Sequence, residues 1–198
     1  MMIKGLLSDG VRQDNNSTGG GDLAGRDIVK PVTYISNTYN QPRKGFMARY
    51  SERYRQDLEQ AKTYQGTVDR LRHYTELVIG ETIIGLEDKL SAAHFPNIEW
   101  AKTAKENFVK QLAMYQFSES AQMIHAHLLA ALHSRFENFI TPLIVAGQPI
   151  GEILAVVHSK LIEYIEEKAE DNVTELDEVH FNGMLYFLTG NCHIKWTP

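Results

Sequence analysis

From Phe46 onward, apolar residues recur every three or four positions, which is the spacing of one face of an α-helix. The first apolar stripe extends to about Leu90, and we expect a break at Gly66 with Thr67 capping the second half. The other predicted helices are Asn97 to about Phe117, Ser118 to Gly147 with a kink or early end at Pro142, 150–169, and about Glu175 to Gly190. Residues 41–198 are therefore predicted to form an all-α bundle of five or six helices.

Two segments of different composition precede the helical region. Residues 1–21 are polar and rich in glycine, so we expect a flexible segment. Residues 22–40, DLAGRDIVKPVTYISNTYN, predict a short glycine-rich β segment. No other stretch predicts a strand, so its backbone groups would lack a partner within the chain. We expect it to serve in oligomerisation or docking, by pairing with other copies through Asp22, Gly25, Arg26, Asp27, Tyr34 and Ile35.

The composition excludes several broad classes of partner. The formal net charge is −5, which gives no general reason to expect nucleic acid. A basic run at residues 43–55 is followed by acidic residues, so we expect nucleic-acid contact only indirectly. The single cysteine, Cys192, can form no internal disulfide, which favours a reducing, cytoplasmic setting. No apolar window approaches the length that spans a bilayer, so no membrane partner is expected.

The glycine-rich stretch at 19–25 lacks the marks of a nucleotide-binding loop. No Gly-Lys-Ser/Thr follows it, no strand precedes it and no helix follows it directly. An anion-binding nest of backbone amides is one interpretation, and a flexible turn that leads into a strand is the one we favour. We therefore expect no cofactor.

The histidines raise the question of a metal site. His125 and His127 are two residues apart, so on a helix they point in different directions. His180, Cys192 and His193 lie near the C-terminus and could meet in space, but zinc sites usually have four ligands at recognisable spacing. We expect neither a metal nor a catalytic residue. A small metal-binding protein or hydrolase that uses these three residues is the alternative.

The C-terminal stretch FNGMLYFLTGNCHIKW, residues 181–196, joins a short apolar helix to a compact tail. We expect Gly190 to turn the chain in a left-handed conformation after the helix. Ile194 and Trp196 would otherwise form an exposed apolar cluster, so we expect both to pack on the helical body, with Cys192 buried.

Together with GDLAGRD at residues 21–27, this end resembles the small helical C-terminal domains of bacterial ABC-ATPase three-component conflict systems, a class that includes Lamassu-like anti-phage systems. In that family a GDxAGRD-like stretch often precedes a helical domain, which closes on a G-M-x-Y-x-x-T-G-x-C-H-I-x-W-like end. The corresponding residues here are Gly183, Met184, Tyr186, Thr189, Gly190, Cys192, His193, Ile194 and Trp196.

The resemblance implies an adaptor or effector-coupling role in an anti-phage defence complex, and we expect this adaptor to be non-catalytic because no group of residues has the types and spacing that catalysis requires. Such a subunit would couple an SMC-like ABC ATPase to an effector, and both would be its partners. Domains of this family are often fused behind an effector, whereas only residues 1–20 precede the motif here. We therefore expect this chain to carry no effector of its own, and to be either a stand-alone adaptor or the middle component of the system.

Overall fold

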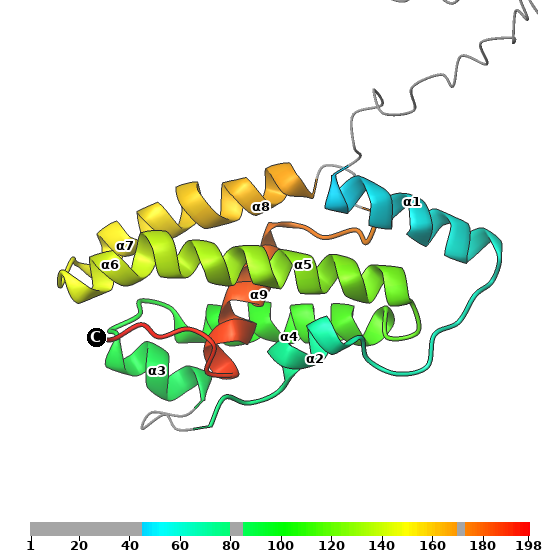
Figure 1. Cartoon of the computed structure of the whole chain (residues 1–198). Helices are drawn as coiled ribbons and strands as arrows, with labels where there is room; N and C mark the ends of the chain where they lie inside the picture. Colours follow the sequence, from blue (N-terminus) through cyan, green and yellow to red (C-terminus); the bar gives the residue numbers. More distant parts are fainter. Residues whose placement is uncertain (1–44, 80–84, 170–172) are drawn as a thin grey trace, which may run out of the picture. The chain divides into compact units, whose positions relative to one another are not determined.

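The structure is a computed structural model of the chain, and it describes residues 45–79, 85–169 and 173–198. All regular secondary structure in these ranges is helical (Figure 1). The expected flexible segment at 1–21 and the expected β segment at 22–40 lie outside the described residues and stay predictions. None of the described helices is long and apolar enough to cross a membrane.

The described residues form seven helices when uninterrupted helices are counted once, rather than five or six. The segments α5, η2 and α6 are continuous, as are α7, η3 and α8, where η2 and η3 are π-helical. The bounds are α1 Phe46–Glu59, α2 Asp69–Thr75, α3 Leu86–Ala92, α4 Ile98–Met114, α5 Glu119–Arg135, η2 Phe136–Ile140, α6 Thr141–Val145, α7 Ile150–Val157, η3 His158–Ile162, α8 Glu163–Lys168 and α9 Glu178–Gly190.

The extra helix arises because the stripe expected from Phe46 to Leu90 is divided into three helices. Thr67 does not cap α2; Val68 occupies the N-cap position, and its N–H donates to Oε1 of Gln122 on α5 at 2.8 Å. Beyond α2 the chain becomes extended, and the N–H of Val78 donates to the carbonyl of Asn191 at 3.1 Å. Bonds to distant residues therefore replace the helical bonds that the periodicity predicts.

The other helix caps and bounds agree more closely with those predicted from the sequence. Asn97 accepts the N–H of Trp100 at 3.0 Å at the start of α4, and Ser118 accepts that of Ala121 at 3.2 Å at the start of α5. The last helix begins at Glu178 rather than near Glu175, because Asp177 and His180 form a reciprocal capping box that sets its first turn.

Pro142 neither ends the long helix nor breaks it. The π-helical segment η2 precedes the proline, so the hydrogen-bond pattern of the helix changes just before the residue that lacks an N–H. Arg135 joins this region to η3, because its Nε donates to the carbonyl of Lys160. Its guanidinium also lies 3.8 Å from the ring centroid of Tyr164. One side chain at the end of α5 thus contacts both η3 and α8.

The core is centred on α5, which contacts α1, α2, α8 and α9 (Figure 1). The α4 and α9 helices make the most extensive helix–helix contact. Gly183 of α9 permits their close approach: a Cβ there would lie 2.8 Å from Cβ of Phe108 and would collide with the carbonyl oxygen of Ala104. The fully buried large side chains include Phe108, Phe136, Phe181, Leu128, Leu132 and Ile165.

Replacing Gly183 by alanine is expected to lower the free energy of unfolding by about 1–3 kcal/mol, because the added methyl overpacks the α4–α9 contact. Urea denaturation measures the change. Gly151→Ala on α7 is the matched control, since nothing lies within 4 Å of its Cβ position. There the better helix propensity of alanine should raise stability by up to about 1 kcal/mol. Equal effects of the two substitutions would contradict the packing role of Gly183.

Candidate functional site

An exposed apolar groove lies between the C-terminal half of α1 and the turn from α4 to α5. Its volume is about 400 Å³. Three large apolar side chains remain exposed in it: 62% of Leu58, 70% of Met114 and 59% of Phe117. We call this surface the apolar groove; its lining residues are Tyr54, Asp57, Leu58, Lys62, Thr63, Met114, Tyr115, Phe117 and Ser118.

Hydrogen bonds fix the loop after α1 against the α4–α5 turn and so shape the apolar groove. The N–H of Tyr64 donates to the carbonyl of Phe117 at 2.7 Å. Nε2 of the buried Gln122 donates to the carbonyls of Gly66, at 2.9 Å, and Gln116, at 2.6 Å. Since these bonds hold the loop after α1 on the α4–α5 turn, the groove is already formed in the isolated chain.

The rim of the apolar groove is polar and charged. Arg53 pairs with Glu119 at 2.7 Å, and Ser120 donates to Asp57 at 2.8 Å. At the inner end, the rings of Tyr54 and Tyr115 pack edge to face, and burial raises the pKa of both hydroxyls. An apolar centre with a polar rim is the anatomy of a protein–protein contact surface.

The C-terminal residues singled out in the sequence lie in the core rather than around a cavity. Tyr186, Cys192, Ile194 and Trp196 are buried, so the tail packs on the helical body as predicted. Burial raises the pKa of Tyr186 to about 12. Nε1 of Trp196 donates to Oγ1 of Thr189 at 3.0 Å. These residues therefore stabilise the fold.

The expected left-handed turn is at Cys192 and not at Gly190. Gly190 is the last residue of α9, whereas Cys192 has a φ of 64°. The N–H groups of Cys192 and His193 donate to the carbonyls of Thr189 and Leu188, which is the bond pattern of a Schellman motif. A Cβ at Gly190 would meet the flexible end of the Lys105 side chain, which can move aside at small cost.

The structure does not bring together the residues of the metal or hydrolase alternative. His180 caps the start of α9, while Cys192 and His193 follow its end, so the rise of the helix separates them by roughly 15 Å. Among the described residues, no group of three or more histidine, cysteine or acidic side chains could hold a metal ion.

His193 lies instead in an aromatic cluster of side chains from α2, α5 and the C-terminal turn. Its ring centroid is 5.2 Å from that of Tyr74, 5.3 Å from that of His73 and 6.1 Å from that of His133. Burial lowers the pKa of His193, and the neighbouring His73 and His133 lower it further. Through these ring contacts, the C-terminal turn packs against α2 and α5.

The other polar residues singled out in the sequence are two histidines of α5, the basic run at 43–55 and the expected contact residues of the β segment. His125 and His127 do point apart, since His125 is wholly buried whereas His127 is half-buried and stacks on Phe46 with a centroid distance of 4.0 Å. In the basic run, Arg53 is paired with Glu119 and Arg55 lies 3.9 Å from Glu52. The proposed contact residues Asp22, Gly25, Arg26, Asp27, Tyr34 and Ile35 lie outside the described residues.

Residues 85–196 match the family model of C-terminal domain 9 (CTD9) of the ABC-three component systems, and this match covers more than half of the chain. The chain belongs to the CTD9 family. The family resemblance predicted from the C-terminal motif is therefore confirmed, and the chain is a component of such a system. No curated protein and no solved structure matches it.

The CTD9 match extends from the start of α3 to the tail and leaves α1 and α2 outside. One wall of the apolar groove, Met114 to Ser118, thus belongs to the CTD9 region, whereas the opposite wall, Tyr54 to Thr63, lies before it. The apolar spacing along the sequence does not predict this groove. Its signal in the sequence is Met114 and Phe117, two large apolar residues next to the Ser118 cap.

Proposed function

We propose that this chain is a non-catalytic adaptor of its ABC-three component system, and that the apolar groove binds the ABC ATPase subunit. The single observation that carries this proposal is the preformed groove, in which Leu58, Met114 and Phe117 are each more than half exposed. Exposed apolar residues gathered in one place and rimmed by charge are typical of a docking site. Membership of a multi-component system supplies the class of partner.

On this proposal the adaptor couples the ATPase to the effector of an anti-phage defence system. The polar rim, with the Arg53–Glu119 pair, would set the orientation of the ATPase, while the apolar centre supplies most of the binding free energy. The complex is expected to be cytoplasmic, since the single cysteine can form no internal disulfide.

Met114→Glu is expected to weaken binding of the ATPase about tenfold or more, because it places a charge in the centre of the contact. The measurement is the amount of the system's ATPase that co-purifies with the tagged full chain after co-expression. Val145→Glu is the matched control: this valine is 68% exposed, but it lies on α6 and outside the apolar groove.

The proposal requires that Met114→Glu loses the ATPase while Val145→Glu retains it, with unchanged melting temperatures for both. If Met114→Glu captures as much ATPase as the unmodified chain, the apolar groove is not the binding site. Equal losses in the two variants would show that capture depends on net charge rather than on this surface.

A further inference from the structure

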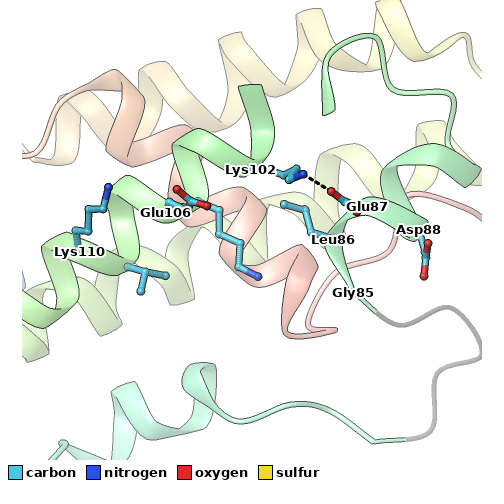
Figure 2. A pocket seen from close by; sticks show the side chains of 9 residues that line it. Gly85, Leu86, Glu87, Asp88, Lys102, Glu106 and Lys110 are labelled. Carbon is cyan, nitrogen blue, oxygen red and sulfur yellow. Dashed lines mark ion pairs between the residues drawn. The ribbon is translucent and has the colours of Figure 1, made fainter. Parts of the chain in front are cut away.

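A second pocket lies between the start of α3 and the middle of α4, and it shares no lining residue with the apolar groove. Its volume is about 540 Å³, within the range of small-ligand sites. The lining combines Leu86 and Val109 with three lysines and three carboxylates, as Figure 2 shows for the labelled residues. We call it the α3–α4 pocket.

Two of the three lysines differ sharply in their surroundings. Lys102 is neutralised, because it pairs with Glu87 (dashed in Figure 2) and with Glu99 at 3.2 Å. Lys105 is half-buried and forms no ion pair or hydrogen bond among the residues that the structure describes. Its side chain crosses to α9, where it lies against Gly190. Burial lowers the pKa of Lys105, and the nearby Cys192 offsets part of this shift.

The remaining charges limit what the α3–α4 pocket can accept. Asp88 and Glu106 also line it and offset the charges of Lys105 and Lys110, so the pocket has no excess positive charge to hold a ligand with several negative charges, such as a nucleic acid or a polyphosphate. A single anion needs only the one ammonium of Lys105. Val109, 42% exposed, and Leu86 offer apolar contact beside the charge. These features select a monoanion that carries an apolar body.

We propose that the α3–α4 pocket binds a carboxylate joined to an apolar chain, with Lys105 pairing the carboxylate and Val109 contacting the chain. A free alkyl carboxylate has this chemistry, and so does the C-terminus of a peptide that ends in apolar residues. Pairing relieves the cost of a half-buried ammonium, and burial of the chain adds apolar contact. This site is independent of the ATPase contact at the apolar groove.

Backbone amide chemical shifts of the full chain, labelled with ¹⁵N, test the site directly. One arm titrates octanoate against octylammonium, and the other titrates N-acetyl-leucyl-leucine against its C-terminal amide. Both carboxylates present the proposed chemistry, and both controls lack the anion. We expect saturable shifts at residues 85–88 and 102–110 with at least one carboxylate and with neither control. Tighter binding of octanoate would indicate a free alkyl carboxylate as the ligand, and tighter binding of N-acetyl-leucyl-leucine would indicate a peptide C-terminus.

Two variants test whether the carboxylate binds at Lys105. Lys105→Met keeps most of the aliphatic stem, and Val109→Glu sets a carboxylate one helical turn from Lys105 at an exposed position; each should weaken binding about tenfold or more. Val145→Glu should bind as the unmodified chain does. If neither carboxylate shifts these residues, if the controls shift them equally, or if both variants bind normally, the proposal is wrong.

Discussion

Trp196→Ala is expected to lower the free energy of unfolding by about 3–5 kcal/mol, although the residue lies only two positions from the last residue. The indole is 4% exposed and packs edge to face on Phe95 and Phe136, with centroid distances of 4.9 and 5.0 Å. Its removal leaves a cavity and deprives Oγ1 of Thr189 of a donor. Urea denaturation followed by circular dichroism measures the loss.

Trp100→Ala is the matched control for this prediction. The chain has two tryptophans, and Trp100 is 41% exposed on α4, so the same substitution should cost about 1 kcal/mol or less. Trp196→Phe keeps most of the ring contacts but loses the hydrogen bond, and it should fall between the two. A Trp196→Ala variant as stable as the unmodified chain would mean that the tail does not stabilise the helical body in solution.

Lowering the pH from 7.5 to 5 is expected to reduce the free energy of unfolding by roughly 2 kcal/mol through His125 alone. This imidazole is wholly buried, neither ring nitrogen has a hydrogen-bond partner among the described residues, and burial lowers its pKa from 6.5 to about 3. Below pH 6.5 the unfolded chain therefore binds a proton that the folded chain does not, so stability falls as the pH falls from 6.5 toward 3.

The variant His125→Leu isolates this contribution, because it removes the titrating group and keeps a side chain of similar size. At pH 7.5 its stability should be equal or higher, since two unpartnered nitrogens leave the core. Between pH 7.5 and 5, the variant should lose roughly 2 kcal/mol less of its free energy of unfolding than the unmodified chain does. The free energy of unfolding of this variant should still fall with pH, but less steeply, because burial also lowers the pKa values of His127 and His193. Identical pH profiles for the two proteins would contradict the role of His125.

Local patterns in the sequence were enough to predict the all-α class and most of the helices. Asn97 and Ser118 bind backbone N–H groups three residues away, so the starts of α4 and α5 are determined within a single turn. The apolar spacing over 150–169 likewise predicted the α7–η3–α8 helix, in which Ile153, Val157 and Leu161 are buried. The C-terminal motif, taken together with GDLAGRD at residues 21–27, also indicated the family.

Tertiary contacts decided the features for which local sequence patterns gave wrong predictions. The stripe from Phe46 to Leu90 is divided because Val68 and Val78 donate to Gln122 and Asn191, which are remote in the chain. Periodicity cannot distinguish an N–H that bonds four residues back from one that bonds across the fold. The left-handed turn is at Cys192 rather than Gly190, and it places the following His193 against Tyr74 of α2 and His133 of α5.

The candidate sites depend on the tertiary structure even more strongly. The apolar groove requires Leu58 of α1 beside Met114 and Phe117, and nothing in either segment alone shows that these side chains stay exposed. Lys105 is distinctive only because α9 buries half of it without supplying an anion. Helical spacing and caps act within one or two turns, so the sequence determined the helices and the family. Exposure and charge pairing depend on which distant segments pack together, and only the folded chain decides that.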